Sequence, residues 1–156
     1  MRKTTIIILL ISLISLFAQQ DIEVESIGSR DASKKVLVAG EFSQFRYDII
    51  KKVAEKFSDV YFETSTFKEA KEKSLDNYEA VIVVGQLKGW MIMNSKEKRL
   101  LRKAGKDKGI LFITAGDPDY EWTDKKTGVE MITGASEDAN TDEFVKSISD
   151  QLDEKL

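Results

Sequence analysis

Apolar residues along this chain form two alternating patterns. Short runs that are apolar almost throughout predict buried β-strands. Five such runs are present, at 34–40 (KKVLVAG), 59–64 (DVYFET), 79–85 (EAVIVVG), 109–116 (GILFITAG) and 128–133 (GVEMIT). Between most of them, apolar residues recur every three or four positions, which predicts amphipathic helices. The helices are expected at about 43–57, from 67 onward, at 95–104 and from 140 onward.

Local capping signals mark where the helices begin. Ser43 stands where a side-chain N-cap is expected before the first helix. The stretch TFKE at 66–69 fits a capping box, in which Thr and Glu satisfy each other's backbone N–H groups. The stretch NTDE at 140–143 predicts the start of the last helix.

Strands and helices that alternate with short connections predict a parallel sheet with helices on both faces. Right-handed crossovers leave few possible topologies. For five strands in one domain, we expect an α/β three-layer sandwich with strand order 2-1-3-4-5 over residues 34–156.

The first residues have the composition of an export signal. Arg2 and Lys3 precede the apolar run Ile6–Phe17, and the small residue Ala18 follows. The run is shorter than the roughly 20 residues needed to span a bilayer. Residues 1–18 therefore predict a secretory signal peptide, residues 19–33 a polar linker, and the mature domain a secreted or periplasmic location with no stable membrane span.

The composition excludes several kinds of chemistry. The chain has no His and no Cys, so it can build neither a His-dependent nucleophile system nor a His/Cys zinc site. We predict no catalytic residue and no metal site. The net charge is −3, and loss of Arg2 and Lys3 with the signal makes it −5. A domain this acidic is not expected to bind nucleic acid.

Ligands of open α/β sheets bind at the carboxyl ends of the strands. Four loops are expected there, at 40–45, 85–94, 115–122 and 133–140. Trp90, Tyr120 and Trp122 lie in these loops, and their rings either stack on a flat cofactor or cover the end of the core.

Two of these loops resemble those of the flavodoxin family. YEAVIVVG followed by a Trp-bearing loop is similar to the family's third strand and its first flavin-flanking loop. ITAGDPDY is similar to the fourth strand and the Gly-Asp-x-x-Tyr loop, matching at Gly116, Asp117 and Tyr120. The resemblance implies a flavodoxin-like fold and FMN as cofactor, with Trp90 and Tyr120 beside the flavin ring and Asp117 nearby.

The loop after the first strand departs from that family. Flavodoxins hold the FMN phosphate there with several Ser and Thr residues at a helix start. Here the loop reads AGEFSQFR, so Ser43 supplies a single hydroxyl and Glu41 adds a negative charge, which Arg46 is expected to offset in part.

The stretch EMITGAS at 130–136 resembles the acceptor motif of FMN-binding domains that carry a covalent flavin. The resemblance implies a flavin site at Thr133 and Gly134, with Ser136 as the acceptor hydroxyl. The alternative is a strand-to-helix turn, in which Gly134 allows the tight bend and Ser136 or Asn140 caps the helix.

Two charged clusters also have two interpretations each. The acids between 117 and 124 form either a turn or a cation site, and their spacing is not that of an EF-hand. The basic stretch at 96–108 forms either a solvated helix face or a docking surface for an acidic partner or anionic lipid. Its residues are Lys96, Lys98, Arg99, Arg102, Lys103, Lys106 and Lys108.

Together, these features predict an extracytoplasmic flavodoxin-like protein that binds FMN and passes electrons to a redox partner protein. The alternative is a module that has the fold without the cofactor and binds a protein partner at the same sheet edge.

Overall fold

The computed structural model describes residues 22–87, 93–114 and 122–156. Within these residues, five strands form one sheet in which every neighbouring pair is parallel. The strand order is β2-β1-β3-β4-β5, as predicted. The strands are β1 (Lys34–Gly40), β2 (Val60–Ser65), β3 (Ala80–Gln86), β4 (Gly109–Thr114) and β5 (Met131–Gly134).

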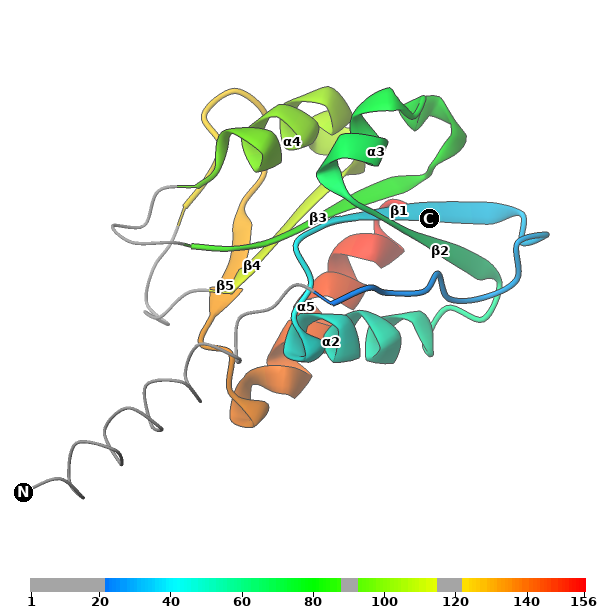
Figure 1. The fold of residues 1–156 in the computed structure, drawn as a ribbon, viewed down its shortest axis with the longest axis horizontal. Helices are drawn as coiled ribbons and strands as arrows, with labels where there is room; N and C mark the ends of the chain where they lie inside the picture. The colour runs from blue at the N-terminus through cyan, green and yellow to red at the C-terminus, as the bar shows by residue number, and fades with distance from the viewer. Residues whose placement is uncertain (1–21, 88–92, 115–121) are drawn as a thin grey trace, which may run out of the picture.

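Helices cover both faces of this sheet and confirm the predicted three layers. In Figure 1, α3 (Phe67–Glu72) and α4 (Ser95–Lys108) lie on one face. The opposite face carries α2 (Gln44–Ala54) and α5 (Thr141–Asp153). Short 3-10 turns stand at Leu75–Asn77 and Asp138–Asn140. None of the helices in the described ranges is both long and apolar enough to cross a bilayer.

Alternate residues of each central strand face opposite layers. Val36 and Val38 of β1 pack toward α2 and α5, whereas Leu37 and Ala39 pack toward α3 and α4. All four side chains are fully buried. A strand covered on both faces needs apolar residues at every position, which explains why its sequence shows a continuous apolar run.

The predicted caps of α2 and α3 are present. The Ser43 hydroxyl accepts a hydrogen bond from the Arg46 backbone N–H at 3.4 Å. Thr66 and Glu69 form both bonds of the capping box. The start of α5 differs, because the Asn140 side chain donates to the Ala135 carbonyl instead of capping the helix. A 3-10 turn leads into α5 there.

Helix α4 extends beyond its predicted end. We expected it to finish at Ala104, and the regular helix does stop there, because Gly105 has φ 72° and ψ −177°. A residue with a side chain rarely adopts that conformation. One further turn carries the chain on to Lys108.

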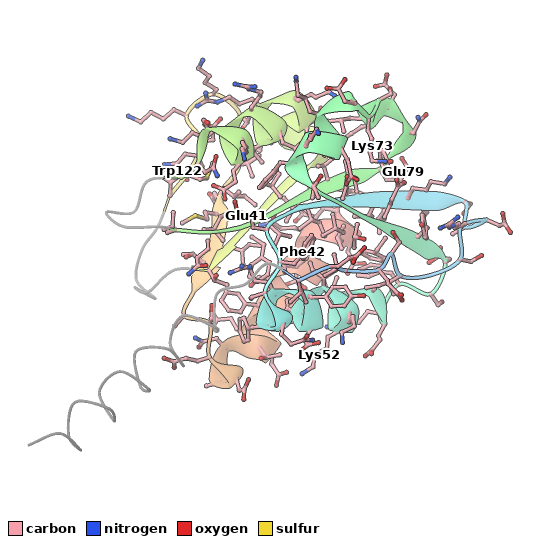
Figure 2. The ribbon with its side chains drawn as sticks, viewed as in Figure 1. Glu41, Phe42, Lys52, Lys73, Glu79 and Trp122 are labelled. Atoms are coloured by element: carbon pink, nitrogen blue, oxygen red, sulfur yellow. The ribbon has the colours of Figure 1, made fainter. Side chains whose placement is uncertain are left out.

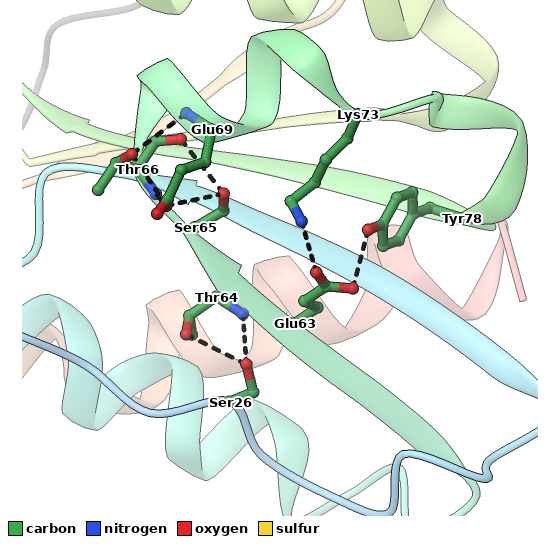
Figure 3. A network of polar contacts seen from close by, with 8 residues as sticks. All are labelled: Ser26, Glu63, Thr64, Ser65, Thr66, Glu69, Lys73 and Tyr78. Atoms are coloured by element: carbon green, nitrogen blue, oxygen red, sulfur yellow. Dashed lines mark hydrogen bonds and ion pairs between the residues drawn. The ribbon is translucent and has the colours of Figure 1, made fainter.

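Residues 22–28, which were predicted as part of a linker, lie along the outer edge of β2. The backbone groups of Ile27 and Phe62 exchange two hydrogen bonds, at 2.9 and 2.8 Å. The Ser26 hydroxyl accepts from the Thr64 backbone N–H at 3.1 Å (Figure 3). Ile22, Val24 and Ile27 pack against the core on the α2 side. This segment covers an otherwise open strand edge, so the folded unit begins before residue 34.

Candidate functional site

The predicted site lies at the carboxyl edge of the sheet, and the structure describes part of it. Ser43, Thr133, Gly134 and Ser136 are described. The other predicted site residues, Trp90, Gly116, Asp117 and Tyr120, lie outside the described residues. The geometry of the flavin-flanking loops therefore stays a prediction, whereas the ends of all five strands can be examined.

The turn after β1 is bonded to the protein on both sides. The Glu41 N–H donates to the Val84 carbonyl at 3.2 Å, and the Phe42 carbonyl accepts from the Ile22 N–H at 3.0 Å. The Phe42 side chain is buried, with 4% of its surface exposed. Figure 2 shows Glu41 and Phe42 at this turn. Of the three residues between β1 and α2, only Ser43 has a hydroxyl, and this hydroxyl caps α2.

Arg46 joins the ends of three strands. Its side chain is 5% exposed. The guanidinium donates from Nε to the Glu41 carbonyl at 2.9 Å and from Nη1 to the Thr114 hydroxyl at 3.1 Å. A longer contact of 3.5 Å reaches the Gln86 side chain. Because β1, β3 and β4 end at these partners, Arg46 acts as an internal brace across the carboxyl edge.

These contacts test whether the first loop fits an FMN phosphate. Such a site needs several hydroxyl and backbone N–H donors at a helix start. In this loop the single hydroxyl caps the helix, the Glu41 N–H belongs to a strand contact and the Arg46 guanidinium bonds protein oxygens. The described residues after β1 therefore do not fit a flavodoxin-type phosphate anchor. The partial offset of the Glu41 charge by Arg46 stays a prediction.

The stretch Thr133–Ser136 lies at the end of β5, on the same edge. Thr133 Oγ1 is buried and has no hydrogen-bond partner among the described residues. Gly134 is buried against the Phe144 ring, and Ser136 is exposed. Strands β3 and β4 separate the end of β5 from the end of β1, which leads into the turn that carries Ser43. Ser43 and this stretch therefore lie at the same edge of the sheet.

The same edge has a hollow of about 530 Å³ on the β2 side. Its walls are the ends of β1 and β2, the start of α3 and the segment 22–26. Three carboxylates (Glu23, Glu41 and Glu69) and two amines (Lys68 and Lys96) line it. Sequence reasoning missed this hollow because one wall comes from the residues that were predicted as a linker.

Glu69 is ionised at one side of this hollow. Hydrogen bonds from the Thr66 backbone N–H and hydroxyl hold the pKa of Glu69 below its ordinary value. Figure 3 shows these bonds together with the contact from Ser65. A hollow with fixed negative charge is a poor site for a phosphate.

Trp122 packs against protein. Its half-buried side chain lies against the apolar cluster between the sheet and α4, and its carbonyl accepts from the Met131 N–H at 2.8 Å. Figure 2 shows Trp122 beside the first turns of α4. This placement supports the core-covering interpretation for Trp122.

Asp124 belongs to an internal ion pair. Its carboxylate, 1% exposed, lies 2.9 Å from Arg102 Nη2 and accepts from the Thr127 N–H and hydroxyl. The pKa of Asp124 is lowered, chiefly by the hydrogen bond from Arg102 and against the effect of burial. Asp117, Asp119 and Glu121 lie outside the described residues. The part of the chain that is described holds no cluster of three or more Asp or Glu side chains placed to bind a metal ion.

Comparison with known proteins identifies the fold. Oxidised flavodoxin 2 from Bacillus cereus is 18% identical, with a TM-score of 0.50 over 78% of this chain and 99% of that chain. Oxidised flavodoxin 1 from Bacillus cereus is 12% identical, with a TM-score of 0.50 over 80% and 99%. No protein-family model and no curated protein matches the sequence. At these identities the likeness establishes a flavodoxin-like fold.

Proposed function

We propose that this protein is an extracytoplasmic flavodoxin-like binding module that docks a protein partner at the carboxyl edge of its sheet. The observation that carries the proposal is the hollow of about 530 Å³ beside the β1 turn, where the Ser43 hydroxyl and the Arg46 guanidinium are already bonded within the protein. Ligands of this fold bind at the carboxyl edge of the sheet. In this protein that edge has a hollow on the β2 side, whereas Arg46 ties the strand ends together on the β4 side.

The chemistry of the hollow favours a polypeptide over a phosphate-bearing cofactor. Carboxylates outnumber amines along its walls, and apolar side chains of Ile22, Val24 and Phe67 lie between them. A polypeptide offers apolar side chains together with charged and neutral hydrogen-bond donors. It can therefore complement a surface that mixes apolar side chains with carboxylates. A phosphate would be repelled by the carboxylate of Glu69, which the hydrogen bonds from Thr66 keep ionised.

The extracytoplasmic location rests on the N-terminal sequence alone. A basic start, an apolar run of about a dozen residues and a small residue follow one another as in secretory signals. An exported protein meets its partner in the compartment to which it is exported. Because the sequence has no Cys, its fold does not depend on the redox state of that compartment.

FMN binding with electron transfer is the second candidate. One specific observation favours it, namely the buried Thr133 hydroxyl at the end of β5, which has no partner among the described residues. In this case Trp90, Gly116, Asp117 and Tyr120 would contact the flavin, Thr133 and Gly134 would lie near it, and a redox partner protein would receive the electrons. The flavin itself supplies the redox chemistry, so no catalytic side chain is required.

The visible spectrum of the purified mature chain separates the two candidates. We expect a colourless protein whose fluorescence does not change on addition of FMN. A flavin band near ~450 nm, before or after FMN addition, would overturn the proposal in favour of electron transfer. Colour that survives denaturation and disappears in Ser136→Ala would assign a covalent flavin to that hydroxyl.

A further inference from the structure

A second hollow, of about 380 Å³, lies between α3 and α4, the helices that cover one face of the sheet. Its apolar lining consists of Phe67 and Leu100, which also contact the core between these helices and the sheet. Leu100 is 5% exposed, so it lies deep in the hollow and not on the rim. We call this hollow the basic groove, for the charges that surround it.

Every charged side chain that lines the basic groove is positive. These residues are Lys68, Lys71, Lys96, Arg99 and Lys103, and all five are exposed. The chain as a whole has a net charge of −3, so this concentration runs against the overall sign. Like charges held together repel one another and lower stability in the absence of a counter-charge.

Three acids on α3 and α4 offset the groove's positive charge only weakly, because two of them cap helices and the third makes an exposed pair. Glu97 is 1% exposed and accepts from the Asn94 N–H in the cap of α4. Glu69 belongs to the capping box of α3. Glu72 lies 3.6 Å from Lys71, in a pair that is mostly exposed and therefore weak.

One end of the groove is fixed and the other opens toward the carboxyl edge. Lys103 Nζ donates to the carbonyls of Lys71 and Lys73, at 3.0 and 2.7 Å, and so ties α4 to the end of α3. At the opposite end, Phe67, Lys68 and Lys96 line both the basic groove and the hollow at the edge. The two hollows therefore form one continuous surface.

We propose that the basic groove binds an acidic segment of the partner protein, with an apolar side chain of that segment inserted against Phe67 and Leu100. Charge complementarity selects the acids, and the apolar floor selects a segment that also carries a hydrophobic residue. A flat anionic membrane would meet the lysines on the rim but would not reach Leu100. This inference rests on the proposed function and names the chemistry of its partner.

Fluorescence anisotropy of a rhodamine-labelled peptide of Glu-Glu-Leu repeats tests the groove. We expect salt-sensitive binding that falls about tenfold in Lys96→Glu/Arg99→Glu. The matched control, Lys52→Glu/Lys56→Glu, changes two exposed residues, one on α2 and one just after it. It changes the net charge equally and should bind within about twofold. Far-UV circular dichroism confirms that both variants fold.

Several results would overturn the inference. Equal losses in both variants would mean that only net charge matters, and equal binding of a Gln-Gln-Leu peptide would mean that only hydrophobic contact matters. Binding of phosphatidylglycerol vesicles without peptide binding would assign the groove to a membrane. A dimer in sedimentation that dissociates in Lys96→Glu/Arg99→Glu would assign it to a second copy of this chain. None of these outcomes depends on flavin colour, so failure here is distinct from failure of the proposed function.

Discussion

The ring of Phe144 lies so close to Gly134 that a Cβ on Gly134 would stand 2.7 Å from the ring's Cζ atom. Phe144 is 2% exposed and is held between Phe112, at 5.1 Å between ring centroids, and Phe45, at 6.1 Å. The ring has little room to move away. The φ angle of Gly134 is not positive, so its backbone conformation is open to other residues as well. Close packing, and not the tight turn that we predicted, therefore requires glycine at this position of the TGAS stretch.

Gly134→Ala should lower the free energy of unfolding by about 1–3 kcal/mol, because the added methyl group overpacks a rigid aromatic cluster. Urea unfolding followed by circular dichroism measures the change. Ser136→Ala, two residues further and exposed, is the control and should stay within about 0.5 kcal/mol of the parent. A fully stable Gly134→Ala would show that Phe144 can shift and that the glycine has another purpose.

Arg46→Met should destabilise the domain by about 2–4 kcal/mol, because it leaves the Glu41 carbonyl and the Thr114 hydroxyl without their buried donor. Thermal unfolding of the two proteins measures the loss. Lys52→Met removes a cation from the exposed face of the same helix (Figure 2) and should change stability by less than about 0.5 kcal/mol. Equal stability of both variants would contradict the bracing role of Arg46.

Much of the fold could be predicted because its signals are local. Runs such as 79–85 identify strands covered on both faces, and Ser43 and Thr66 identify helix starts from neighbouring residues alone. Given five parallel strands, connection rules then restrict the order. Both steps use residues that are close in sequence.

The remaining features depend on contacts between distant residues. Arg46 meets Thr114, 68 positions later in the chain, and no local pattern marks that contact. Residues 22–28 lack a clear period because they use one short antiparallel bridge and three apolar side chains to cover β2. For the same reason the hollow beside them could not be predicted, since it exists only where that segment meets β1 and β2.

Removal of residues 22–28 should destabilise the domain by about 2–5 kcal/mol, because Ile22, Val24 and Ile27 lose their packing. The uncovered edge of β2 should also promote association between chains. A chain that starts at residue 29 is compared with one that starts at residue 20, by urea unfolding and light scattering. If the two chains were equally stable and equally monomeric, residues 22–28 would be a linker after all.

Asp124→Asn should destabilise the domain by about 1–3 kcal/mol at pH 7, because the side chain keeps its size but loses the charge that pairs with Arg102. The hydrogen bond from Arg102 is the largest cause of the lowered pKa of Asp124. A carboxylate whose pKa is lower in the folded state stabilises the fold above its unfolded pKa, here 3.8, and loses this effect as the pH falls through the folded value.

The pH dependence therefore distinguishes this ion pair from simple packing. The difference in unfolding free energy between the parent and Asp124→Asn should be constant from pH 7 to about pH 5 and should shrink below about pH 4. Urea midpoints measured across this range give the difference directly. Asp59→Asn, at an exposed turn before β2, should show a difference near zero throughout. A parent–variant difference for Asp124 that does not change with pH would mean that the carboxylate contributes shape and hydrogen bonding alone, and that its charge does not stabilise the contact between α4 and the turn before β5.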